Sequence, residues 1–208
     1  MSIVKLNNRG VRSVTAFGSL SSGAITFIKK LTASSSASLS FVDGSSDVVL
    51  DNTYKEYLFT FKNIHLATDS DDFGWQANAA SESGYNETVT SSAFTPYHQE
   101  NGGSGQVVYN TGSDQAQGTG IVQLTQNQGN SADNNAGGFL HLFNPSDTTF
   151  VKHFISSLSY DHATVAPAAV SLFAAGYVNT TSAINDIKFF TRSGGNIDAG
   201  DICLYGIN

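Results

Sequence analysis

Hydrophobic and polar residues alternate with a period of two along much of the chain. Between residues 37 and 41, alanine, leucine and phenylalanine alternate with serines, and between 57 and 61 a tyrosine and two phenylalanines alternate with leucine and threonine. Successive side chains of a β-strand point to opposite faces of its sheet, so this pattern predicts strands with one buried face. Further strands are predicted at 24–31, 73–77, 121–125, 138–143, 150–160, 170–178, 184–191 and 201–207.

Clusters of Gly, Asn, Asp and Ser separate these segments, for example at 43–46, 144–147 and 193–196. Such clusters are typical of turns. About eight to ten short strands without a helical period predict an all-β fold, an antiparallel β-sandwich of jelly-roll type. We expect this domain to span residues 31–208, with residues 1–30 as an N-terminal arm or peripheral strand outside it.

Two segments fit this scheme less well. Residues 82–120 are rich in Gly, Ser, Asn and Gln, and are long for a loop without structure; we expect at least one more strand, near 106–110. Residues 165–175 are rich in alanine, which favours a short helix, whereas Pro167 and the neighbouring strands favour a buried strand.

Charged residues are scarce and unevenly placed. They make up 13% of the 208 residues, against roughly 25% in an average soluble domain, so the polar surface must come from Ser, Thr, Asn, Gln and Gly. The net charge is −7, with no acid before Asp43 and nine acids but no Lys or Arg from Asn63 to Val151. The only bases before Asp43 are Lys5, Arg9, Arg12, Lys29 and Lys30.

Two interpretations of this asymmetry are open. The charges are ordinary solvated side chains, or the basic N-terminal segment attaches to an acidic partner and leaves the acidic middle facing outward. Five scattered bases on an acidic protein make a weak footprint for nucleic acid, so no nucleic-acid partner is expected. We also expect no membrane partner and synthesis in a cytoplasm, because the sequence has no apolar run of about 18 residues and no signal-peptide core at its N-terminus.

Motifs that carry chemistry are scarce. The sequence has no nucleophile elbow, phosphate-binding loop, zinc-protease motif or paired cysteines, and its histidines are scattered, so we predict neither an enzyme nor a cofactor. The lone Cys203 lies in an apolar run, which favours a buried thiol. Asp69, Asp71 and Asp72 offer oxygen ligands and are a weak calcium candidate, although their spacing departs from the EF-hand loop. A carboxylate pair that cleaves glycosides needs no local motif and stays a minor alternative.

Aromatic residues at strand positions are expected in the core. Tyr85, Tyr97 and Tyr109 instead lie in the polar segment 82–120. Rings among amides and hydroxyls are what a sugar-binding surface uses, because a ring stacks on a pyranose while amides bond its hydroxyl groups. The same rings also anchor long loops or intersubunit contacts, so both interpretations stay open.

The stretch 54–65, Y-K-E-Y-L-F-T-F-K-N-I-H, resembles the pattern Y-x-x-Y-x-F-x-F-x-N-I-H of virion structural proteins of tailed bacteriophages, many of them marine. Three later regions agree with it in order. They are 112–120, then 140–146 with 151–155, and finally 175–177 through 195–197 to 200–207. The resemblance extends over about residues 31–207, and none of its motifs is catalytic.

This resemblance implies a jelly-roll-like sandwich that forms part of a virion. We expect a capsid-surface decoration, cement or fibre protein that joins the particle through its N-terminal segment. Its expected partners are further copies of itself, as a homotrimer, and other virion proteins such as the major capsid protein. A tail component or a host-glycan-binding module on the virion surface is the alternative.

Overall fold

The computed structural model describes residues 24–80, 82, 84–164 and 168–208, whose strands form two antiparallel sheets. The larger sheet, called sheet A, has nine strands. In spatial order eight of them are β1 (Ile25–Thr32), β13 (Ile197–Ile207), β3 (Glu56–Leu66), β9 (Ala136–Phe143), β10 (Lys152–Asp161), β11 (Ala168–Val178), β5 (Val89–Gln99) and β6 (Gly105–Tyr109), while β7 (Gln115–Gly118) also pairs with β5. The smaller sheet, called sheet B, has the order β2 (Ser38–Val42), β12 (Ile184–Thr191), β4 (Phe73–Ala79) and β8 (Val122–Gln123).

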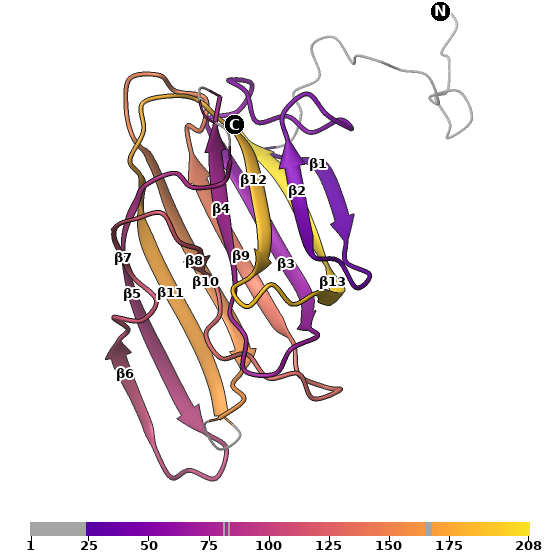
Figure 1. The fold of residues 1–208 in the computed structure, drawn as a ribbon, viewed down its shortest axis with the longest axis vertical. Helices are drawn as coiled ribbons and strands as arrows, with labels where there is room; N and C mark the ends of the chain where they lie inside the picture. Colours follow the sequence, from indigo (N-terminus) through magenta and orange to yellow (C-terminus); the bar gives the residue numbers. More distant parts are fainter. Residues whose placement is uncertain (1–23, 81, 83, 165–167) are drawn as a thin grey trace, which may run out of the picture.

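Sheet B lies over part of sheet A, and the rest of that face has no second sheet opposite it. Figure 1 shows β2, β12 and β4 in front of β13, β3 and β9, while β5 and β6 extend beyond them. This arrangement confirms the predicted all-β antiparallel sandwich; its jelly-roll type stays a prediction. Within the described ranges no helix is long and apolar enough to cross a membrane.

The core between the sheets is built around one phenylalanine of β12. The ring centroid of Phe189 lies 5.3 Å from that of Phe59 and 5.2 Å from that of Phe61, both on the opposite sheet. The rings of Phe41 and Phe73 lie at 6.1 and 6.2 Å from it. All five side chains are 2% exposed or less. Rings of this size dominate the apolar area that a core removes from water, so the period-two pattern of β3 and β12 directly forms the core.

A bulge keeps β3 and β13 in phase with this core. Phe61 and Ile64 are three positions apart yet both are buried, which a regular strand does not allow. The pairing shifts register between them, and Asn63 has a φ of 52°. Opposite it, Gly200 has a φ of 120°, and a Cβ there would lie 2.7 Å from the Asn63 carbonyl oxygen. Glycine is therefore required where the two bulged strands approach.

The polar segment 82–120 contains more structure than we predicted. The expected strand near 106–110 is present as β6, but the eleven-residue β5 was not predicted. Its inward positions hold small or polar residues, and Pro96 interrupts its sequence. The pairing of β5 with β11 is interrupted at Thr95 and Pro96, as expected for a residue without an N–H.

Three other segments expected from the sequence have different boundaries in the structure. The strand expected at 121–125 is only Val122–Gln123, because the N–H groups of Leu124 and Thr125 both donate to the Phe73 carbonyl and the chain turns there. The segment 168–175 belongs to strand β11, not to a helix, while residues 165–167 lie outside the described residues. Strand β1 crosses the expected boundary between residues 30 and 31 and pairs along β13 as an edge strand of sheet A.

Candidate functional site

Three hollows meet at the end of β10. Their volumes are about 480, 280 and 350 Å³. Tyr160, Asp161 and His162 connect them, since each of these residues lines two of the three. We call the first the acidic hollow and the second the tyrosine hollow, after the residues that line them.

The hollows exist because sheet B ends at the two-residue strand β8. Thr95 and Tyr97 on β5 and Val170 on β11 lie on the same face of sheet A as the core, but they line the tyrosine hollow. Val170 is buried, whereas Thr95 and Tyr97 are only partly buried. The short β8 therefore leaves this end of the inner face without a second sheet, and Figure 1 shows β5 and β6 beyond the edge of sheet B.

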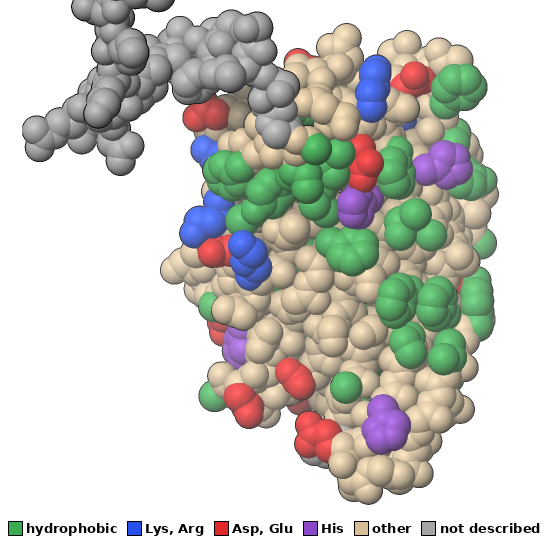
Figure 2. Space-filling view, turned by 180° about the vertical axis from the view of Figure 1, so that it is seen from behind, with side chains coloured by type: hydrophobic (Ala, Val, Ile, Leu, Met, Phe, Trp, Pro, Cys, Tyr) green, Lys and Arg blue, Asp and Glu red, His purple; other side chains and the backbone are tan. Residues whose placement is uncertain are grey.

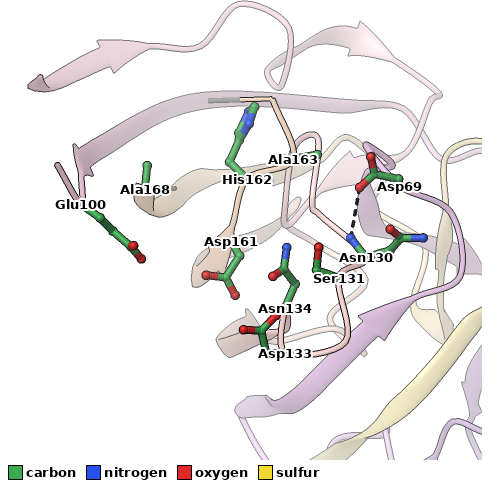
Figure 3. Close-up of a pocket in the computed structure, with 10 residues that line it drawn as sticks. All are labelled: Asp69, Glu100, Asn130, Ser131, Asp133, Asn134, Asp161, His162, Ala163 and Ala168. Carbon is green, nitrogen blue, oxygen red and sulfur yellow. Dashed lines mark hydrogen bonds between the residues drawn. The ribbon is translucent and has the colours of Figure 1, made fainter. Parts of the chain in front are cut away.

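The acidic hollow holds four carboxylates and no Lys or Arg in its lining, which consists of Asp69, Glu100, Asn130, Ser131, Asp133, Asn134, Asp161, His162, Ala163 and Ala168. Figure 3 shows Asp69 near one end beside Asn130 and Glu100 at the other end. Two of the carboxylates already accept backbone N–H groups: Asp69 from Asn130 at 3.2 Å and Asp161 from Asn135 at 3.2 Å. These bonds hold the surrounding loop in place and occupy part of the acceptor capacity.

The calcium candidate does not form one cluster. Asp71 accepts hydrogen bonds from the hydroxyl and the backbone N–H of Ser193, at 2.5 and 3.1 Å. Asp72 accepts from Arg192 at 3.0 Å and from Gln123 at 2.6 Å. In the described part of the chain no three His, Cys, Asp or Glu residues are grouped to hold a metal ion. Asp71 and Asp72 instead join their loop to the turn after β12 and to β8.

The acidic middle of the chain does not all face outward, contrary to the docking interpretation of the charge pattern. Asp71, Asp72 and Glu87 are buried. Glu87 accepts a hydrogen bond from the backbone N–H of Ala79 at 2.9 Å. A buried carboxylate is retained where several donors surround it, so these three acids are structural.

Two of the five expected attachment residues lie in the described part of the chain. Lys29 and Lys30 lie on the edge strand β1, and the Lys30 Nζ is 3.1 Å from an oxygen of Asp201 on β13. The hydrogen bond from the Thr32 hydroxyl, together with this contact to Lys30, keeps the pKa of Asp201 below its usual value. Lys5, Arg9 and Arg12 lie outside the described residues.

The tyrosine hollow brings together two of the three tyrosines singled out from the sequence. Tyr97 and Tyr109 line it, together with Asn110 and Gln126. Tyr85 lies elsewhere, with the Nζ of Lys188 4.4 Å from the centroid of its ring. The pairing of β5 with β6 sets Tyr109 opposite Phe94. Its ring therefore lies on the outer face of sheet A, and Tyr97 is the tyrosine of this pair whose ring faces the hollow.

Hydrogen bonds fix the walls of the tyrosine hollow. The Tyr109 hydroxyl donates to Asp114 at 2.7 Å, and this bond raises the pKa of Tyr109. Gln106 donates to the hydroxyl of Tyr97, which lowers the pKa of Tyr97. The Nδ2 of Asn110 donates to the Gln126 Oε1 at 2.6 Å. The side chains are therefore held in one arrangement before any ligand arrives.

Tyr160 and His162 complete the hollow and were not expected from the sequence. Tyr160 is 4% exposed, and no described group lies in hydrogen-bonding geometry to its hydroxyl, although the Gln126 backbone is near enough to affect its pKa. Burial raises the pKa of Tyr160 and lowers that of His162. Both residues lie at the end of a strand that is otherwise ordinary in sequence, so no local motif marked them.

The outer face of sheet A, turned away from sheet B, is a second candidate site. Figure 2 shows hydrophobic side chains gathered on this face. One row of successive cross-strand partners runs through Phe27, Tyr205, Leu58, His141 and Ile155. A second row contains Phe139, Ser157, Phe173 and Phe94.

The two candidate sites differ in chemistry. The tyrosine hollow places hydrogen-bonding groups beside aromatic rings, which suits a small polar ligand with an apolar face. The outer face of sheet A presents rings with few charges, which suits another protein surface. The chain matches no protein-family model, no curated protein sequence and no solved structure.

Proposed function

We propose that this protein is a structural subunit of a phage virion, a decoration, cement or fibre protein of the capsid surface. In this proposal it assembles as a homotrimer and joins other virion proteins, such as the major capsid protein, through its N-terminal segment. The virion context is supported by the sequence resemblance over residues 31–207. The assembly role is supported by one structural observation, the apolar outer face of sheet A. A tail component would use the same face and is the alternative position in the particle.

The rings and aliphatic groups of this face are unusually exposed. The exposed fractions are 57% for Ile25, 56% for Phe27, 50% for Ile155 and 45% for Phe94. A soluble monomer seldom presents apolar side chains that are close together in this way. Covering them with another protein would remove apolar area from water at about 25 cal/mol per Å².

The face carries two separate patches. The β1 patch consists of Ile25, Phe27 and Tyr205, with the last two rings in edge-to-face contact at 5.6 Å. The β11 patch consists of Phe94, Phe173 and Ile155, which surround a hollow of about 110 Å³, and its two phenylalanine rings stack at 5.0 Å.

Two different patches favour a ring of copies over a symmetric pair. A cyclic trimer needs a head-to-tail interface in which one patch of each copy contacts a different patch of the next. Strand β1 is one edge of sheet A, whereas β11 lies toward the other. Three sheets with their outer faces turned to a common axis would bring the β1 patch of one copy to the β11 patch of its neighbour.

The solution mass of the purified protein tests the assembly role. Light scattering is expected to give three times the 22.0 kDa chain mass, and the double substitution Phe94→Ser with Phe173→Ser is expected to give the mass of one chain. Phe150→Ser is the matched control, because Phe150 is 70% exposed but belongs to neither patch. A monomeric parent protein, or a double variant that associates as the parent does, would contradict the proposal.

Attachment to the particle needs a separate experiment. Deleting residues 2–23 removes Lys5, Arg9 and Arg12 but leaves β1 and the sandwich intact. The shortened protein is expected to keep the parent's oligomeric state and melting temperature and to be missing from particles of the phage that encodes it. Its normal incorporation would show that attachment does not depend on this segment.

A further inference from the structure

The tyrosine hollow has features of a binding site that the structural role does not use. It is lined by Thr95, Tyr97, Val108, Tyr109, Asn110, Thr111, Gln126, Tyr160, His162 and Val170. Its volume of about 280 Å³ is at the lower end of the roughly 300–1,000 Å³ range of small-molecule sites. It is therefore large enough for one sugar ring and too small for a large cofactor.

The apolar part of the hollow suits the C–H face of a pyranose. The Tyr97 side chain on β5 and the Val108 side chain on β6 lie on the inner face of sheet A, and Val170 lies in the same wall. The ring of Tyr109 lies on the outer face with its partner Phe94 and does not belong to this wall. Val108 is 41% exposed, so the wall is open to solvent. A ring placed against it would exchange water for apolar contact on both surfaces.

Three side chains with hydrogen-bond donors line the same hollow. The Tyr160 hydroxyl is buried and makes no hydrogen bond of normal geometry to a described group. The Oε1 of Gln126 accepts from Asn110, while no described residue accepts from its Nε2. The Thr95 Oγ1 accepts from Asn110 at 3.2 Å, which leaves its own proton to donate. Leaving such a buried hydroxyl unpaired costs free energy that a bound oxygen atom would recover.

The charges near the hollow decide what kind of ligand it accepts. No Lys or Arg lines it, and Asp114 is bonded directly to Tyr109. Burial lowers the pKa of His162, so this side chain is neutral at neutral pH and supplies no cation. The whole chain carries a net charge of −7. Carboxylated or sulfated sugars would be repelled, whereas uncharged hydroxyl groups would not.

We propose that the tyrosine hollow is a saccharide-binding site for one neutral pyranose ring of a larger glycan. Tyr97 and Val108 contact the C–H face of the sugar, and Tyr160, Gln126 and Thr95 donate hydrogen bonds to its oxygens. This site would add glycan recognition to the assembly role. It does not depend on that role, because the hollow and the outer face of sheet A lie on opposite sides of the sheet.

The test uses the full chain and a glycan array, followed by titration with the methyl glycosides of galactose, glucose and mannose and with a sialic acid glycoside. We expect binding of at least one neutral glycoside and none of the sialic acid glycoside, detected by saturation-transfer NMR. Tyr160→Phe removes only the hydroxyl and is expected to weaken binding roughly fivefold to tenfold. Tyr97→Ala removes a ring and is expected to weaken binding by more than tenfold.

Tyr85→Ala is the control, because Tyr85 lies outside the hollow and contacts Lys188; its affinity is expected to match the parent's. Unchanged affinity in Tyr160→Phe and Tyr97→Ala, absence of binding on the array, or preference for the sialylated ligand would each overturn the proposal. Light scattering on the same variants separates the two proposals, since a lost sugar site leaves the trimer mass unchanged.

Discussion

The two faces of sheet A come from the same strands but differ in use. On β3, Tyr57 and Phe59 point inward and are fully buried, while Leu58 and Thr60 between them point outward and are only partly buried. The inward positions meet sheet B, whereas nothing in the chain's described part covers the outer rings. Strict alternation therefore identifies a buried face, but it does not imply that the opposite face is polar. Here both faces carry rings, and only one of them stabilises the single chain.

Removing the central ring of the inner face is the strongest test of this difference. Phe189→Ala is expected to lower the free energy of unfolding by about 3–5 kcal/mol, because it opens a cavity where four other rings meet. Phe139→Ala on the outer face removes an equal ring that is 38% exposed, and is expected to cost less than about 1 kcal/mol. Urea unfolding of dilute, dissociated protein measures both.

Equal losses in the free energy of unfolding for Phe189→Ala and Phe139→Ala would contradict this difference between the inner and outer faces. They would mean that the outer face is buried within the single chain. A larger loss of stability for Phe139→Ala in concentrated, associated protein than in dilute protein would leave this difference intact, because association covers the outer face and stabilises the folded chain.

Two adjacent glycines of β9, Gly137 and Gly138, test how much room the two faces of sheet A leave beside the backbone. A Cβ on Gly138 would lie 2.1 Å from the Ser157 carbonyl oxygen and 2.7 Å from the Leu158 Cα, whereas one on Gly137 would only touch the Phe61 carbonyl oxygen at 3.6 Å. Gly138→Ala is therefore expected to cost about 1–3 kcal/mol, since backbone must move. Gly137→Ala is expected to change stability little. Thermal unfolding of both variants decides, and a loss in Gly137→Ala as large as in Gly138→Ala would show that the close approach is not the cause.

Much of the fold could be predicted because long strands with apolar inward positions reveal their period. Strands β3 and β12 were predicted for this reason. Strand β5 was missed because its inward positions include Ser91 and Thr95, which are small and polar and therefore give no hydrophobic period. The bulge at Asn63 and Gly200 was also not predicted, because it depends on two strands that are far apart in sequence.

The candidate site could be predicted only in part. Tyr97 and Tyr109 stood out because they are rings in a polar segment, and β5 and β6 are neighbours in sequence. Tyr160 and His162 come from β10, and only the order of strands in sheet A brings them beside β5. The carboxylates of Asp71 and Asp72 looked like ligands, yet their donors, Ser193 and Arg192, are more than 100 positions away.

Alkaline pH gives the smallest effect and the finest test of the inner face. Burial raises the pKa of Tyr57 and Tyr160 above the ordinary value of 10.0, with the nearby charges of Asp51 and Asp43 adding to the rise at Tyr57. Below pH 10 both tyrosines are neutral whether the chain is folded or not. Above it the unfolded chain releases these protons and the folded chain keeps them, so stability falls by up to about 1.4 kcal/mol per pH unit for each tyrosine.

This fall in stability is best measured above about pH 10.5, because below that pH the titration of Lys152 changes stability in the opposite direction. Burial lowers the pKa of Lys152 from 10.5, so the unfolded chain holds the extra proton and stability rises with pH until that value is passed. Tyr160→Phe lacks one buried titrating hydroxyl, and its urea midpoint is expected to fall less steeply between about pH 10.5 and 11.5 than the parent's. An identical slope would mean that Tyr160 ionises in the folded chain as easily as in the unfolded one, and that the inner face near the tyrosine hollow is wet.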